Sequence, residues 1–142
     1  MSDTHGYFFE DLKVGMTASF AKTVSEADIV LFAGVSGDTN PMHIDQEFAA
    51  KTQFKGRIAH GILSASFIST VIGTRLPGPG SIYLSQSLRF KAPVRIGDTV
   101  TARVEVAELF PEKKRATLKT VCTVGGTVVT EGEALIMAPS RG

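Results

Sequence analysis

The stretch HGILSASFISTVIGTRL, residues 60–76, decides the fold of this chain. Its apolar side chains surround the predicted helix almost completely, at Ile62, Leu63, Ala65, Phe67, Ile68, Val71 and Ile72. A helix that is apolar nearly all round is typically buried. The sequence Pro77-Gly78-Pro79-Gly80 follows at once and ends the helix. We therefore expect one long central helix that the rest of the chain covers.

Strand patterns dominate the sequence after this helix. The predicted strands cover residues 16–23, 81–91, 98–109, 116–124 and 127–137. The last two are separated only by Gly125-Gly126, a strong signal for a two-residue hairpin. One long helix beside a meander of strands favours an α+β layer arrangement. The sequence predicts a single domain over residues 1–142, with an antiparallel sheet wrapped around the helix.

Shorter helices are expected before the central one. Ser25 is a typical N-cap, and Glu26 and Asp28 follow in the first turn, where carboxylates suit the helix dipole. That helix ends near residues 34–37, and a second short helix is expected over 45–52. A sheet that wraps only partly around a helix leaves open edges, so pairing with a second copy of the chain is expected.

Composition and charge restrict the class of protein. The chain has 142 residues, of which 43% are hydrophobic and 20% charged, as in a soluble globular domain. The net charge of +1 argues against a nucleic-acid or membrane-surface role. The apolar stretch 62–72 is too short and too interrupted by hydroxyl residues to span a membrane. No signal peptide is evident, and with a single cysteine a reducing cytoplasm is expected.

The residues that can carry chemistry lie in SGDTNPMH, residues 36–43. Asp38 and His43 are five positions apart on a predicted loop, and Pro41 biases Asn40 away from helix. A carboxylate and an imidazole that reach one water are the minimum for general acid–base catalysis. Spacing alone also fits a less specific arrangement, in which Asp38 closes a turn and His43 fills a surface notch.

His60-Gly61 opens the central helix. The first backbone N–H groups of a helix have no intrahelical partner, and with the helix dipole they form a donor site for a developing oxyanion. Gly61 would let a substrate approach closely. The alternative is that Gly61 only eases a tight helix entry while His60 caps or packs.

Other kinds of site find no support in the sequence. The histidines and acidic residues lack the spacing of metal ligands, so no metal is expected. No nucleophile elbow or phosphate-binding glycine loop is present. Cys122 lies in a strand-like run and is expected to be a small buried hydrophobe.

The run FAGVSGDTNPMHID, residues 32–45, resembles the hydratase-2 motif of the MaoC-like, (R)-specific enoyl-CoA hydratases. The resemblance continues through IAHG at 58–61 and LPGPGSIYL at 76–84. It extends from about Val14 to Met137 and is closest to the short, single-domain PhaJ-type hydratases that supply polyhydroxyalkanoate synthesis.

This resemblance implies a hot-dog fold, a homodimer, and reversible hydration of trans-2-enoyl-CoA to (R)-3-hydroxyacyl-CoA. By position, Asp38 and His43 match the acid–base pair that holds the water. The N–H of Gly61 matches the oxyanion donor to the thioester, and Ser69 matches the hydroxyl that orients Asp38. No cofactor is implied beyond the CoA that the substrate carries.

The acyl chain is expected to lie against the central helix and the inner face of the sheet, with Leu63, Phe67 and Leu84 as candidate lining residues. Two further functions stay open. A 3-hydroxyacyl-ACP dehydratase would carry the same motif, and a non-catalytic acyl-CoA-binding or dimerisation module would share the fold. A hot-dog thioesterase is disfavoured because residues 61–74 contain no Asp or Glu.

Overall fold

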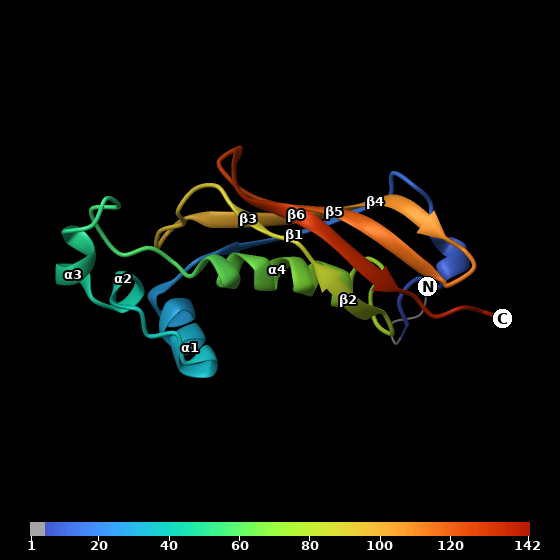
Figure 1. Ribbon diagram of the computed structural model, residues 1–142, viewed down its shortest axis with the longest axis horizontal. Coiled ribbons are helices and arrows are strands. Elements are labelled where there is room, and N and C mark those ends of the chain that lie inside the picture. The colour runs from blue at the N-terminus through green and yellow to red at the C-terminus, as the bar shows by residue number, and fades with distance from the viewer. Residues whose placement is uncertain (1–4) are drawn as a thin grey trace.

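The computed structural model describes residues 5–142, in which a six-stranded antiparallel sheet packs on one long helix (Figure 1). The strands follow the order β1-β4-β5-β6-β2, and β3 pairs with β6. The predicted α+β architecture is confirmed. The elements are a 3₁₀ turn at Phe9–Asp11, β1 Thr17–Thr23, α1 Glu26–Ser36, α2 Pro41–Ile44, α3 Gln46–Ala50, α4 Gly61–Thr74, β2 Ile82–Gln86, β3 Arg89–Phe90, β4 Thr99–Phe110, β5 Arg115–Val124 and β6 Thr127–Met137.

The core lies between α4 and the inner face of the sheet. Alternate residues of β4 are fully buried, as the sequence predicts: Val100, Ala102, Val104 and Val106. On α4 the matching buried residues are Ile68, Val71 and Ile72. Figure 1 shows α4 lying along the sheet, with α1, α2 and α3 gathered beyond its N-terminal end. The three short helices therefore gather at the N-terminal end of α4.

The expectation that α4 is buried all round is wrong for a single chain. Ile62 is 52% exposed, and Ser69 and Gly73 are also exposed. The sheet covers one side of the helix and leaves the other side open. Apolar patterning identified a buried helix, but it could not say that one chain supplies only half of the cover.

The single strand expected over residues 81–91 is also wrong, because two shorter strands take its place. The chain crosses closely over Gly132, where an added Cβ would lie 1.8 Å from the carbonyl oxygen of Ser87. Ser87 also bonds to Glu133 through both its backbone N–H, at 2.9 Å, and its hydroxyl, which accepts from the Glu133 N–H at 3.0 Å. This local pairing ends β2 and restarts the ladder as β3.

Local signals at the element ends are confirmed. The hydroxyl of Ser25 accepts from the N–H of Asp28 at 3.2 Å, and the Asp28 carboxylate accepts from the Ser25 N–H at 2.9 Å, so α1 starts with a capping box. Gly125 and Gly126 have φ values of 55° and 84°, as a tight hairpin between β5 and β6 requires.

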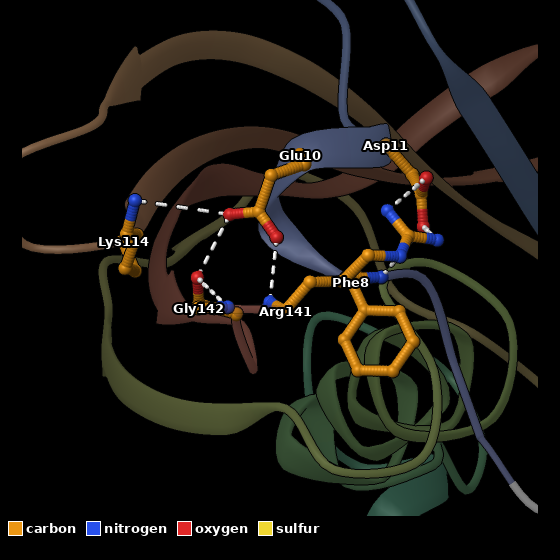
Figure 2. A network of polar contacts seen from close by, with 7 residues as sticks. Phe8, Glu10, Asp11, Lys114, Arg141 and Gly142 are labelled. Atoms are coloured by element: carbon orange, nitrogen blue, oxygen red, sulfur yellow. Dashed lines mark hydrogen bonds and ion pairs between the residues drawn. The ribbon is translucent and has the colours of Figure 1, made fainter.

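The two ends of the described chain are joined by polar contacts at the end of α4 away from α1–α3 (Figures 1 and 2). The guanidinium of Arg141 donates to both carboxylate oxygens of Asp11, at 2.8 and 3.0 Å. The Arg141 backbone N–H donates to Glu10 at 2.7 Å. The hydrogen bonds from Arg141 and the Phe8 N–H hold the pKa of Asp11 below its usual value.

The sulfur of Cys122 is buried beneath the central helix. Its S–H donates to the carbonyl oxygen of Ser64 at 3.4 Å, and burial raises the pKa of the thiol to about 12. The expected role as a small buried hydrophobe is confirmed. In the part of the chain that is described, none of the helices has the length and apolarity needed to cross a membrane.

Candidate functional site

Three segments meet at the N-terminal end of α4. Asp38 follows α1, His43 lies in α2, and His60 is the residue immediately before α4. One carboxylate oxygen of Asp38 and one ring nitrogen of each histidine all lie within 4.8 Å of one another. His43 and His60 are only 8% and 2% exposed, whereas Asp38 is exposed. The structure therefore brings together the two predicted acid–base residues, and it adds a third residue beside them.

The segment before His43 is more ordered than the expected loop. The carboxylate of Asp38 accepts from the N–H of Asn40 at 3.2 Å, which closes a turn. The side-chain oxygen of Asn40 then accepts from the N–H of Met42 at 3.0 Å and caps α2. Pro41 occupies the first turn of α2, where its missing N–H costs nothing. His43 thus lies on a short helix rather than on a loop, because Asn40 and Pro41 start one.

The orientation of His43 is set by a backbone carbonyl. Its Nδ1 lies 2.8 Å from the oxygen of Ile58, and a carbonyl can only accept, so Nδ1 carries the hydrogen. In the neutral ring, Nε2 then keeps its lone pair. Such a ring can take a proton from a water held beside it.

His60 is the functional neighbour whose role the sequence left undecided between capping and packing. It makes no capping hydrogen bond to α4. Its ring stacks on that of His43 with centroids 3.9 Å apart, and its Nε2 lies 2.9 Å from the backbone oxygen of Asp38. The signal that pointed here is its position directly before Gly61 in the motif.

Gly61 is the first residue of α4, as expected. Among residues 5–142, no hydrogen bond uses its N–H, which also lacks an intrahelical partner. A Cβ at this position would lie 2.6 and 2.7 Å from two ring atoms of Phe90. The ring of Phe90 therefore fits against the glycine backbone, a contact that sequence reasoning did not find.

A cavity of about 390 Å³ adjoins these residues. His43 and Gly61 line it, with Ile58, Ser64, Phe90 and Thr130 among the other lining residues. Ser64 and Thr130 are both nearly fully buried, so two hydroxyl groups line the cavity beside its apolar residues. Neither of them was predicted from the sequence. The arrangement offers a base, an N–H donor and a space for a small substrate group.

The three residues predicted to line the acyl chain do not share one cavity within a single chain. Leu63 borders a shallow hollow beside α1, and Phe67 packs in the core against Phe20, with ring centroids 5.9 Å apart. Leu84 is 38% exposed and borders a separate hollow between α4 and β2. Their role in binding an acyl chain stays a prediction.

Ser69 lies on the exposed side of α4, eight residues after Gly61. That separation corresponds to about 12 Å along a helix axis. Within residues 5–142, its hydroxyl makes no hydrogen bond to Asp38. A single chain therefore does not bring Ser69 onto the carboxylate that it was predicted to orient.

The geometry of the two histidines fits acid–base chemistry better than metal binding. The lone pairs of an imidazole lie in the plane of its ring, and these two planes are stacked at an angle of 28°. Stacked rings project their nitrogens side by side rather than toward one ion. In addition, Nδ1 of His43 and Nε2 of His60 are already engaged with backbone carbonyl oxygens.

The chain is similar to known proteins over nearly its whole length. Residues 11–132 match the family described as MaoC like domain. The chain is 65% identical over 136 residues to an (R)-specific enoyl-CoA hydratase of Rhodospirillum rubrum, covering 96% of this chain and 94% of that protein.

Two solved structures share the fold. The R-hydratase PhaJ1 from Pseudomonas aeruginosa matches with a TM-score of 0.91 and 48% identity, covering 99% of this chain and 90% of that one. An (R)-hydratase from A. caviae involved in PHA biosynthesis matches with a TM-score of 0.89 and 47% identity, covering 92% of this chain and 99% of that one. These likenesses confirm the expected hot-dog fold. The chain belongs to the MaoC-like domain family.

Proposed function

We propose that this protein is an (R)-specific enoyl-CoA hydratase that reversibly adds water to trans-2-enoyl-CoA to give (R)-3-hydroxyacyl-CoA. The observation that carries this assignment is the convergence of Asp38 and His43, because a carboxylate oxygen of Asp38 lies within 4.8 Å of a ring nitrogen of His43. His43 also lines the same cavity as Gly61, the first residue of α4. The similarity to the R. rubrum hydratase supports the same reaction.

The two side chains hold and activate one water. Nε2 of His43 has a free lone pair because Nδ1 donates to the carbonyl of Ile58. The carboxylate of Asp38 accepts a second hydrogen bond from the same water. As the water oxygen bonds to the β-carbon of the enoyl thioester, one proton of the water passes to this pair of side chains. The pair then returns one proton to the α-carbon on the same face, so that one water is added and the pair is restored.

The N–H of Gly61 stabilises the charge that this addition creates. Electron density moves from the double bond to the thioester oxygen, which becomes an enolate oxygen before the α-carbon is protonated. A fixed donor at a helix N-terminus stabilises this oxygen more in the transition state than in the ground state. Phe90 lies against Gly61, where any added side chain would meet its ring.

A spectrophotometric assay with crotonyl-CoA tests the activity through the loss of the enoyl-thioester absorbance. One water fixed on one face of the double bond predicts a single enantiomer, and the similarity to the (R)-specific R. rubrum hydratase favours the (R) alcohol. Chiral analysis of the product measures it. Formation of the (S) alcohol would contradict the proposed water position, and absence of any turnover would favour a non-catalytic acyl-CoA-binding module.

The same assay separates the two acyl carriers. The catalytic motif is compatible with both a CoA thioester and an acyl-carrier-protein thioester. We propose the CoA ester, because the R. rubrum relative is named an enoyl-CoA hydratase. Crotonyl-ACP and crotonyl-CoA should be compared at equal concentration, and a higher kcat/KM for crotonyl-ACP would instead favour a 3-hydroxyacyl-ACP dehydratase.

We also propose that the enzyme is a homodimer. A hollow of about 360 Å³ lies between α4 and the edge strand β2, lined by exposed apolar residues including Ile62, Tyr83 and Leu84. A second copy that covers this face would also bury the exposed side of α4, and with it Ser69. That copy could supply the hydroxyl that a single chain does not bring to Asp38.

Sedimentation velocity at micromolar concentration tests the dimer. Ile62→Lys should shift the protein toward the monomer, because it places a charge on the apolar face. Val14→Lys is the matched control, since Val14 is also apolar and exposed but lies at a turn before β1. A stable wild-type monomer would contradict the proposal, as would a dimer that Ile62→Lys leaves unchanged.

Three further statements belong to the same proposal. The reaction needs no cofactor beyond the CoA of the substrate, so treatment with a chelator should leave kcat unchanged. The buried, reduced Cys122 is compatible with a cytoplasmic enzyme. The product, an (R)-3-hydroxyacyl-CoA, is a monomer for polyhydroxyalkanoate synthesis, and the similar A. caviae hydratase takes part in that pathway.

A further inference from the structure

His60 is buried to a degree that apolar packing alone does not explain. Its ring is 2% exposed and contacts the rings of His43, at a centroid distance of 3.9 Å, and Phe32, at 4.8 Å. It does not cap α4. Burying a polar ring costs free energy unless its hydrogen bonds compensate. A phenylalanine would fill this space without that cost, so the polar atoms of His60 require a reason.

One ring nitrogen of His60 reaches the catalytic segment. Nε2 lies 2.9 Å from the backbone carbonyl oxygen of Asp38, so Nε2 carries the hydrogen and donates it. In the neutral ring, Nδ1 is then an acceptor, and within residues 5–142 it is buried with no hydrogen-bond partner. Burial therefore leaves Nδ1 without a hydrogen bond, while Nε2 donates to the backbone of Asp38.

The same short segment also positions His43. The carbonyl of Ile58, two residues before His60, accepts from Nδ1 of His43 at 2.8 Å. The His60 ring itself lies nearly parallel to the His43 ring, at 28°. One face of the His43 ring is therefore packed by His60, while its edge is held by Ile58. Residues 58–60 therefore contact both the backbone of Asp38 and the ring of His43.

We infer that His60 is a positioning residue for the hydration reaction, a role that rests on the function proposed above. Its Nε2–H fixes the backbone that carries the Asp38 carboxylate, and its ring face fixes the plane of His43. Through these two contacts it sets the separation between the two groups that share the water. His60 itself does not exchange a proton with the substrate.

Two substitutions separate the contacts that His60 makes. His60→Phe keeps the ring face and removes the donor, whereas His60→Gln keeps a donor of similar reach and removes the ring. Displacing a catalytic group by about 1 Å can lower the rate by about 100-fold. We expect His60→Phe to lower kcat for crotonyl-CoA by up to that factor with KM nearly unchanged, and His60→Gln to recover part of the loss.

Thermal stability distinguishes positioning from a structural role. His60→Phe removes a buried acceptor that lacks a partner and also the hydrogen bond to the Asp38 carbonyl, two changes with opposite effects on stability, so its melting temperature should stay close to that of the wild type while kcat falls. A residue that only fills space would show unchanged kcat in this variant. His5→Phe and His5→Gln are matched controls, because His5 is exposed and stacks on Phe8 near the N-terminus. Neither substitution should change kcat.

¹⁵N NMR of the imidazoles gives a readout that does not depend on turnover. The chain has three histidines, so His5→Gln identifies one set of signals directly. At a pH where the rings are neutral, His60 should show a protonated Nε2 and a bare Nδ1, and His43 the reverse. In His60→Phe, the His43 signals should broaden or shift.

The possible outcomes decide the role. Wild-type kcat in a folded His60→Phe variant, or a His60 ring protonated on Nδ1, would overturn it while leaving the hydratase proposal intact. If His60→Phe does not fold, the kcat of His60→Gln and the wild-type NMR spectrum test the role instead. A kcat for His60→Gln below about 1% of the wild-type value would overturn the role of the donor. A wild-type protein without any hydratase activity would instead overturn the proposed function, whatever the NMR spectrum shows.

Discussion

The sheet and the N-terminal end of α4 are built in opposite ways. On β4 and β5, alternate apolar side chains are fully buried, among them Val104 and Leu118. Each makes the same kind of apolar contact. At the N-terminal end of α4, the buried side chains include two imidazoles, each hydrogen-bonded to one backbone carbonyl. The sheet gains stability from many similar apolar contacts, whereas the site depends on a few hydrogen bonds with fixed partners.

This difference separates stability from activity. Apolar burial contributes about 25 cal/mol per Å² regardless of direction, so the sheet tolerates exchanges that conserve volume. A hydrogen bond depends on distance and angle, so a small displacement near His43 changes the chemistry more than the stability. Substitutions in the two regions should therefore affect different measurements.

The largest expected effect is on kcat, from the acid–base pair. Asp38→Asn keeps the shape but removes the carboxylate, and His43→Gln removes the imidazole. Each should lower kcat by about 10²–10⁴-fold while KM changes much less. The double variant should be far less impaired than the product of the two single effects, because the two groups act on one water.

Steady-state kinetics with crotonyl-CoA measures these effects, and circular dichroism checks the fold. Since Asp38 is exposed, its replacement should leave the melting temperature almost unchanged. A folded Asp38→Asn enzyme with nearly wild-type kcat would contradict the mechanism. Asp38 would then only close a turn.

The next effect is on stability, from the sheet. Leu118 on β5 is fully buried, so Leu118→Ala should lower the free energy of unfolding by about 2–5 kcal/mol. Lys119→Ala is the matched control, because Lys119 is adjacent on the same strand and exposed. Urea unfolding measures both. We expect kcat per folded molecule to stay at the wild-type value, and a large loss of kcat for folded Leu118→Ala would contradict the separation.

A smaller effect is expected where the two regions touch. A methyl group at Gly61 would meet the ring of Phe90 on β3 at 2.6 Å, so Gly61→Ala must displace that ring or the helix start. We expect a loss in kcat/KM of up to about 100-fold. If the ring causes the loss, Gly61→Ala combined with Phe90→Ala should recover activity, whereas additive losses would show that the helix start itself had moved.

The smallest effect is expected far from the site, at the joined chain ends (Figure 2). Arg141 lowers the folded-state pKa of Asp11, so its contribution to stability is present above the ordinary carboxyl pKa of 3.8 and is lost as the pH falls through the lower folded value. Arg141→Ala should raise the pKa of Asp11 toward 3.8 and leave kcat unchanged. A carboxyl NMR titration measures the shift, and an unchanged Asp11 pKa would show that the pair does not form in solution.

Local patterns predicted the parts of the fold that depend on neighbouring residues. The capping box at Ser25, the hairpin at Gly125-Gly126 and the alternation on β4 each follow from residues a few positions apart. The break between β2 and β3 was missed because it depends on Gly132, which lies far along the chain. The open side of α4 was missed because a helix pattern does not reveal how much cover one sheet provides.

By itself, the sequence determined the type of each long element, the buried positions of β4, and the catalytic candidates Asp38, His43 and Gly61. These follow from periodicity and from a motif contained in short segments. Only the tertiary structure decided that His60 stacks on His43 and holds Asp38, that Phe90 lies against Gly61, and that Ser69 is directed away from the site of its own chain. Such contacts join residues distant in sequence, and their geometry depends on packing that no local pattern encodes.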